Sequence, residues 1–257
     1  MQEKIINTSG IQTNYKIAGE GFPLLILHGW GRGIESFTEV QENLAQKGWQ
    51  VIAVDLPGFG KTEEPKEVWG VNEYTNFVLE FAEKLRLKKW VLLGHSFGGQ
   101  IAVNLVAKHP EKVEKLILVA PAAIRKEPGK REHIIRIFAK GANFFLALIP
   151  SNSLQSKVRT LFAMIIGRKD YLQARGVMRD VMRKVIREDV SFLFSQITSP
   201  TLLIWGDKDR AVPVENARIM KAQISHASLK IFKDVGHRIN RDAPKKLSET
   251  ILAFLEQ

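Results

Sequence analysis

The sequence contains no cysteine among its 257 residues, so disulfide bonds, thiolate metal sites and cysteine nucleophiles are excluded. Long apolar stretches are missing too. The longest purely apolar runs, 144–149 and 161–166, hold six residues each, far short of the roughly 20 that a membrane crossing needs. The N-terminus carries an early acid, Glu3, and no apolar stretch of signal-peptide length. We therefore expect a cytoplasmic protein without a transmembrane segment.

Several enzyme motifs are also absent. The sequence has no phosphate-cradling P-loop, no dinucleotide fingerprint and no HExxH helix, so we expect neither a cofactor nor a metal.

Acidic residues are scarce in one segment only. Residues 122–192 hold 15 Lys and Arg against 6 Asp and Glu, which places +9 of the total formal charge of +11 there. Charge confined in this way argues against nucleic-acid binding, which favours an evenly basic chain or a basic tail.

Short apolar runs alternate with helix-patterned stretches along most of the chain. Residues 3–18 read as a hairpin around a turn at 7–10. The predicted buried strands are 24–27, 51–54, 90–93, 116–119, 201–205 and 228–232, and the predicted helices between them are 36–47, 72–85, 100–108, 214–223 and 243–255. This alternation predicts an α/β fold with a mostly parallel central sheet and helices on both faces.

The alternation stops between residues 122 and 192. Three helix-like stretches appear there, near 131–149, 154–166 and 171–188. We therefore expect an α/β core over 1–121 and 193–257 and an inserted helical cap over 122–192.

A serine lies between a predicted strand and a predicted helix, within Gly94-His95-Ser96-Phe97-Gly98-Gly99. The G-x-S-x-G spacing is that of a nucleophile elbow, a sharp turn that projects the serine hydroxyl above the sheet edge. Glycines two residues before and after the serine, Gly94 and Gly98, remove side chains that would collide across such a turn. Ser96 is therefore the candidate nucleophile.

A serine nucleophile needs a base within hydrogen-bond reach and an acid that orients this base. His237 follows the last predicted strand, and loops at the C-terminal edge of a parallel sheet are where active sites assemble. His28 and His95 lie in Gly-rich loops, where we expect packing or hydrogen bonding to the backbone. For the acid, Asp207 and Asp209 both follow the penultimate strand. We favour Asp209, because Asp207 is next to the strand end and could instead cap the turn.

The order Ser96, Asp209, His237 is the order of these three roles in α/β-hydrolases. The chain resembles that superfamily over nearly its whole length. The matching motifs are His28-Gly29-Trp30-Gly31, residues 55–60, 94–99 and 206–213, and Gly236-His237. By this resemblance, the backbone amides of Trp30 and Phe97 form an oxyanion hole, and Gly29 is a glycine of the same loop. The sequence departs from the pattern at Arg238, where many relatives carry an aromatic or aliphatic residue.

A serine at the elbow favours acyl transfer to water, because relatives similar to haloalkane dehalogenases and epoxide hydrolases carry aspartate there. We expect a serine hydrolase that cleaves a small carboxylic ester, or a related acyl bond, through an acyl-enzyme. Two alternatives stay open. One is a carbon–carbon bond hydrolase of a ring-fission diketone, and the other is a non-catalytic receptor or scaffold with the hydrolase fold.

Four arginines, Arg175, Arg179, Arg183 and Arg187, recur every four residues in the third helix-like stretch of the cap. Apolar residues fill the other side, so the pattern predicts an amphipathic helix with an arginine stripe. The stripe is either a solvated outer face or a surface that recruits an acidic carrier or an anionic substrate. The basic cap and the 28–31 motif are loosely similar to those of pimeloyl-acyl-carrier-protein methyl ester esterases, which approach an acidic carrier.

Overall fold

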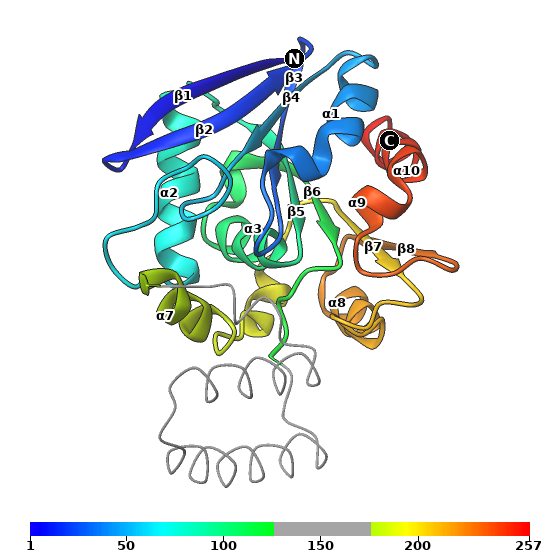
Figure 1. Ribbon diagram of the computed structural model, residues 1–257. Coiled ribbons are helices and arrows are strands. Elements are labelled where there is room, and N and C mark those ends of the chain that lie inside the picture. The colour runs from blue at the N-terminus through cyan, green and yellow to red at the C-terminus, as the bar shows by residue number, and fades with distance from the viewer. Residues whose placement is uncertain (126–175) are drawn as a thin grey trace, which may run out of the picture.

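The computed structural model describes residues 1–125 and 176–257, and its strands form a single eight-stranded sheet (Figure 1). The strands are β1 (Gln2–Thr8), β2 (Ile11–Ala18), β3 (Phe22–Leu27), β4 (Trp49–Val54), β5 (Trp90–His95), β6 (Val113–Val119), β7 (Thr201–Gly206) and β8 (Ala227–Phe232). Their order across the sheet is β1-β2-β4-β3-β5-β6-β7-β8. The hairpin β1–β2 pairs antiparallel with β4, and all pairs from β4 to β8 are parallel. The predicted mostly parallel sheet is confirmed.

The helices lie close to their predicted positions in the core. They are α1 (Thr38–Ala45), α2 (Val71–Lys84), α3 (Phe97–Lys108), α7 (Gly176–Val185), α8 (Glu215–Gln223), α9 (Ile239–Asp242) and α10 (Pro244–Leu255), with 3-10 turns η1 (Ile34–Phe37), η2 (Pro110–Lys112) and η3 (Ser191–Gln196). The sequence analysis missed α9 and the 3-10 turns, which are too short to show a periodic pattern. None of the helices within residues 1–125 and 176–257 has the length and apolar character that a membrane crossing requires.

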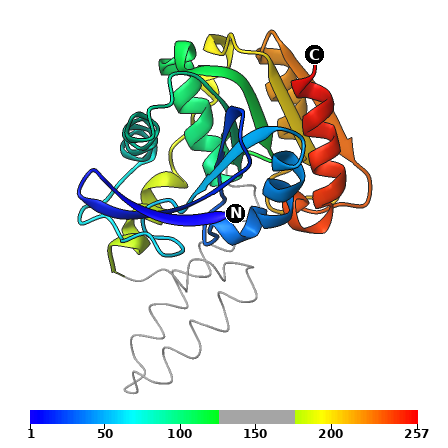
Figure 2. The same ribbon diagram turned by 90° about the horizontal axis from the view of Figure 1, so that it is seen from above.

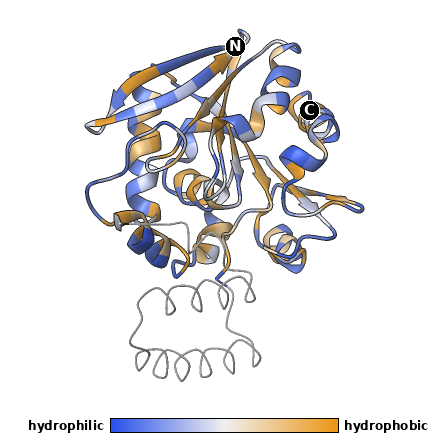
Figure 3. Cartoon of the chain, viewed as in Figure 1, coloured by the Kyte–Doolittle hydropathy of each residue, from blue (hydrophilic) through white to orange (hydrophobic). Residues whose placement is uncertain are grey.

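The central strands are buried on both faces, so alternate side chains enter two separate cores. In β3, Leu25 and Leu27 pack in the core that includes α2, α3 and α8, whereas Leu24 and Ile26 pack in the core that includes α1 and α10. Figure 2 shows α2 and α3 on one side of the sheet and α1 and α10 on the other. The hydropathy colouring follows this arrangement, with apolar residues concentrated on the inner strands (Figure 3).

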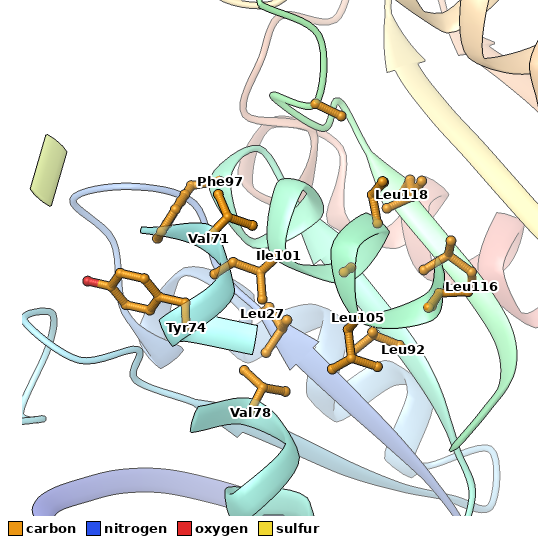
Figure 4. Close-up of a cluster of buried hydrophobic side chains, with 14 of the residues drawn as sticks. Leu27, Val71, Tyr74, Val78, Leu92, Phe97, Ile101, Leu105, Leu116 and Leu118 are labelled. Atoms are coloured by element: carbon orange, nitrogen blue, oxygen red, sulfur yellow. The ribbon is translucent and has the colours of Figure 1, made fainter. Parts of the chain in front are cut away.

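The larger core extends directly to the sharp turn after β5. Tyr74 of α2 is fully buried, its hydroxyl donates to the carbonyl of Pro57 at 2.9 Å, and its ring meets the ring of Phe97 edge to face at 5.0 Å. Figure 4 shows these two side chains beside Ile101 of α3 and Leu27 of β3. Phe97 follows Ser96 in the chain, so the packing of α2 against α3 holds the serine turn in place.

The two helices predicted near 131–149 and 154–166 lie outside the described residues. The third, predicted near 171–188, is represented by α7, which ends at Val185, three residues earlier than expected. The side chain of Gln100 in α3 donates its amide N–H groups to the carbonyls of Val185, at 3.2 Å, and Glu188, at 2.9 Å. A tighter turn follows the helix, in which the Arg187 N–H donates to the Lys184 carbonyl at 3.0 Å and the Glu188 N–H donates to the Val185 carbonyl at 3.3 Å. The bonds from Gln100 hold this turn against α3.

Candidate active site

The candidate site lies at the C-terminal edge of the sheet, beside its centre. After β3 the chain adds β4 on one side of β3, and it then adds β5, β6, β7 and β8 in turn on the other side of β3. The topological switch point therefore lies between β3 and β5. Ligand sites of open α/β sheets form at this point, because the loops after the two strands diverge there. The loops that follow β3, β5, β7 and β8 carry the predicted site residues.

Ser96 has a backbone conformation that is strained for a residue with a side chain, with φ 51° and ψ −112°. The turn is possible because of its flanking glycines. A Cβ on Gly94 would lie 2.5 Å from the Gly98 carbonyl oxygen, and a Cβ on Gly98 would lie 2.3 Å from the Leu27 carbonyl oxygen. The missing side chains allow α3 to begin immediately after β5, as the elbow motif predicts.

Three side chains from distant loops form a hydrogen-bonded chain. The hydroxyl of Ser96 lies 3.0 Å from Nε2 of His237, and Nδ1 of His237 lies 2.7 Å from Oδ2 of Asp209. The only tautomer that serves both contacts carries its proton on Nδ1, which donates to the carboxylate, while Nε2 accepts from the serine. The structure therefore brings together the three residues to which the sequence analysis gave catalytic roles.

Asp209 is fixed by more than the histidine. Its side chain is fully buried, and its Oδ1 accepts the backbone N–H groups of Ala211 and Val212, each at 2.8 Å. The carboxylate thus has one oxygen held by the backbone and the other directed at His237. Asp207, the alternative acid, is exposed, and its backbone N–H donates to the carbonyl of Phe232. The carboxylate that is hydrogen-bonded to His237 is thus that of Asp209.

His95 contacts the candidate base through the backbone. It is 4% exposed, and its Nε2 lies 3.0 Å from the carbonyl oxygen of His237, so Nε2 carries a proton and donates it to this carbonyl. Its Nδ1 has no hydrogen-bond partner among the described residues. Burial lowers the pKa of His95 to about 3, which keeps the ring neutral. Packing and hydrogen bonding to the backbone were both expected of His95, and the structure shows the second, with the carbonyl of His237 as the partner.

The loop after β3 is tied to the loop after β4. Nδ1 of His28 donates to the carbonyl of Gly29 at 2.8 Å, and its Nε2 accepts the N–H of Leu56 at 3.0 Å. Burial lowers the pKa of His28, which preserves this neutral tautomer. The buried carboxylate of Asp55 accepts the N–H of Ile34 at 2.7 Å. These bonds fix both ends of the 28–34 loop, which carries the Trp30 amide.

The two amides expected in an oxyanion hole lie on adjacent segments. Phe97 is the first residue of α3, where N–H groups have no partner within the helix. Trp30 is the second residue of a turn closed by the Arg32 N–H on the Gly29 carbonyl at 3.2 Å, a bond that does not use the Trp30 amide. The Gly98 N–H donates to the carbonyl of His28 at 3.1 Å, which joins the two segments.

A cavity of about 440 Å³ opens beside Ser96, a size typical of small-molecule sites. Apolar side chains, among them Trp30, Phe97, Met182 and Val185, form much of its wall. Arg32, Arg125 and Arg238 also line it. Within residues 1–125 and 176–257, no cluster of three or more His, Asp or Glu side chains is arranged to hold a metal ion.

The predicted arginine stripe lies away from this cavity. Arg175 is outside the described residues, and Arg179, Arg183 and Arg187 are exposed and do not line the cavity. Arg183 pairs with Asp180 at 2.8 Å. The apolar side of the same segment does face inward, since Met178, Val181 and Val185 are buried. Ile186, just after the helix, is 57% exposed and lines the cavity.

Comparison with known proteins identifies the class to which this architecture belongs. A family model described as alpha/beta hydrolase fold matches residues 23–244. The chain therefore belongs to the α/β-hydrolase fold family.

Individual relatives are distant. The 2-hydroxymuconate semialdehyde hydrolase of a Pseudomonas species is 25% identical over 98% of this chain and 93% of its own length. The dihydrolipoyllysine-residue acetyltransferase component of the acetoin cleaving system of Pseudomonas putida is 27% identical over 95% of the chain, which spans 66% of that protein. Among solved structures, an esterase from Exiguobacterium antarcticum has a TM-score of 0.77 at 24% identity, with all of both chains covered. That likeness shows a shared fold.

Proposed function

We propose that the protein is a serine hydrolase that cleaves a carboxylic ester, or a related acyl bond, through an acyl-enzyme. In this proposal Ser96 is the nucleophile, His237 the general base and acid, and Asp209 the residue that orients the histidine. The observation that carries the proposal is the continuous chain of hydrogen bonds from the Ser96 hydroxyl through His237 to a buried, backbone-held carboxylate.

In the first half of the reaction, His237 Nε2 takes the hydroxyl proton as Ser96 Oγ bonds to the ester carbonyl carbon. Negative charge then develops on the carbonyl oxygen, and the amides of Trp30 and Phe97 donate to it. Removing one such donor typically costs about 100- to 1,000-fold in turnover. Collapse of the tetrahedral intermediate transfers the Nε2 proton to the alcohol, which leaves, and the acyl group stays on Ser96.

In the second half, a water donates its proton to Nε2 as its oxygen attacks the acyl carbon. Collapse of this second intermediate releases the carboxylic acid and returns the proton to Ser96 Oγ. Asp209 remains ionised throughout and stabilises the imidazolium form of His237 in both halves. The bond that His95 donates to the His237 carbonyl keeps the His237 ring within reach of Ser96 while the His237 ring gains and loses its proton.

Carbon–carbon bond hydrolysis is the second candidate, and one observation favours it. The 2-hydroxymuconate semialdehyde hydrolase is similar over nearly the whole chain. Comparing p-nitrophenyl esters with a vinylogous diketone as substrates separates the two reactions.

The segment 122–192 is part of the proposal as a cap over the site. The exposed arginines Arg179, Arg183 and Arg187 are its candidate surface for an acidic carrier.

The test uses the variant Ser96→Ala with the control Ser225→Ala, an exposed serine in the turn before β8. We expect wild type and the control to hydrolyse p-nitrophenyl butyrate and to react with a fluorophosphonate probe. Ser96→Ala should fold normally, as judged by circular dichroism, and do neither. Hydrolysis that persists in Ser96→Ala would contradict the nucleophile assignment. A folded wild type that neither reacts with the probe nor turns over any substrate would instead support the receptor alternative.

A further inference from the structure

The charges on the wall of the cavity beside Ser96 are unbalanced. Arg32, Arg125 and Arg238 line it, and Glu188 is the one acidic residue among its described lining residues. The Glu188 carboxylate is directed elsewhere, because its Oε2 accepts the N–H of Val71 at the start of α2, at 2.8 Å. Among the described lining residues, three arginines therefore face one acid whose carboxylate is bonded to α2.

The three arginines differ in their surroundings. Arg125 is close to Asp189, whose Oδ2 accepts the Arg125 backbone N–H at 2.8 Å. Burial opposes ionisation of Asp189, but hydrogen bonds from Ser191 and, to a smaller extent, the Arg125 N–H and charge lower its pKa. For Arg32 and Arg238, no ion pair occurs with any residue in the described part of the chain. These two guanidinium groups carry the uncompensated charge.

Arg32 and Arg238 flank the reacting groups from two loops. Arg238 is the residue after His237, and Arg32 lies two residues after Trp30, on the loop tied to the elbow through the Gly98 N–H bond. Both, together with His95, also line a second hollow, called here the outer hollow, so they are shared between the two. Three glutamates line the outer hollow but not the cavity, and one of them, Glu35, is paired with Lys16 at 2.8 Å.

We propose that Arg32 and Arg238 form an anion subsite, so that the substrate is an ester bearing a carboxylate or phosphate group near the bond that is cleaved. Guanidinium groups suit both anions, since their planar N–H pairs match two oxygens. The apolar remainder of the wall accommodates the carbon chain between the ester and the anion. This inference rests on the proposed hydrolase function and adds the class of substrate.

The test compares esters that differ only in charge. Three p-nitrophenyl esters share the leaving group and differ at the end of the acyl chain, which is methyl in the valerate, carboxylate in the glutarate monoester and phosphonate in 4-phosphonobutyrate. A second pair, phenyl butyrate and 4-carboxyphenyl butyrate, places the charge on the alcohol side. For wild type we expect kcat/KM to be about tenfold higher for the anionic member in at least one of these comparisons, which a single charge-assisted contact supports.

The double variant Arg32→Gln with Arg238→Gln should bring this ratio to about one. Arg241→Gln is the matched control, since Arg241 lines the outer hollow but not the cavity, and it should keep the wild-type ratio. The acyl series also shows which anion is preferred. The inference is overturned if wild type hydrolyses the neutral esters without an anionic preference, if the preference survives the double variant, or if Arg241→Gln abolishes it equally. Failure of the proposed function is distinct, because then no ester is hydrolysed and the fluorophosphonate does not react.

Discussion

Replacing His95 with asparagine should make the protein less sensitive to acid. The pKa of the buried His95 is lowered from 6.5 to about 3, because desolvation disfavours the charged ring. In the unfolded chain this histidine binds a proton below pH 6.5, whereas in the folded protein it stays neutral down to about pH 3. The stability that His95 contributes is therefore fully present above pH 6.5 and is lost as the pH falls towards 3.

The size of the effect follows from the shift in pKa. Each pH unit below 6.5 costs about 1.4 kcal/mol while the folded ring remains neutral, so His95 should account for about 3 kcal/mol of lost stability at pH 4.5. Asparagine does not titrate. Its side chain is too short to replace the bond from Nε2 to the His237 carbonyl, but this loss is the same at both pH values and cancels in the difference between them. Other buried ionisable groups, His28 included, are the same in both proteins, so their contributions cancel in the comparison.

The free energy of unfolding is measured by urea denaturation at pH 7.5 and pH 4.5, followed by the fluorescence of the five tryptophans. Wild type should lose about 3 kcal/mol more of its unfolding free energy between these two pH values than His95→Asn does. His226→Asn, a change at an exposed histidine, serves as the control and should behave as wild type does. Equal losses in wild type and His95→Asn would refute the reasoning that His95 is buried in the neutral form.

Two further predictions concern the acid and the elbow. Asp209→Asn should lower kcat by about 10⁴-fold, because asparagine favours the wrong histidine tautomer, as in a serine protease triad. Asp207→Asn should lower kcat less than tenfold. Steady-state kinetics on one ester measures both effects, and the reverse order would make Asp207 the acid. Gly98→Ala should lower the melting temperature and the yield of folded protein, because its Cβ would lie 2.3 Å from the Leu27 carbonyl oxygen; an unchanged melting temperature in a thermal scan would contradict the close approach.

Much of the fold could be predicted because the central strands are buried on both faces and the helices between them are amphipathic. Leu24–Leu27 and Trp90–Leu93 read as apolar runs, and both are interior strands of the sheet. The residues around Ser96, Asp209 and His237 could be placed for a related reason. Each follows a strand, and parallel strands bring their C-terminal ends to one edge.

Contacts that depend on how loops meet could not be predicted. The bond from His95 to the His237 carbonyl joins residues 142 positions apart, and it requires the end of β5 and the loop after β8 to lie side by side. No local pattern encodes that contact. The bonds from Gln100 of α3 to the Val185 and Glu188 carbonyls at the end of α7 are a similar case, because they join residues 85 and 88 positions apart. Periodicity alone extended this helix, since the pattern of apolar residues continues beyond Val185.

The distribution of arginines shows where sequence and structure emphasise different residues. A four-residue repeat makes Arg179, Arg183 and Arg187 conspicuous in the sequence, but they are exposed and lie outside the cavity. Charges in that position act through the solvent, and screening limits their reach to about 8 Å at physiological ionic strength. Arg32 and Arg238 are exposed as well and belong to no repeat, but they line the cavity beside Ser96. Charge that selects a substrate must act on its bound form, so we regard the two arginines of the cavity wall as the better candidates for specificity.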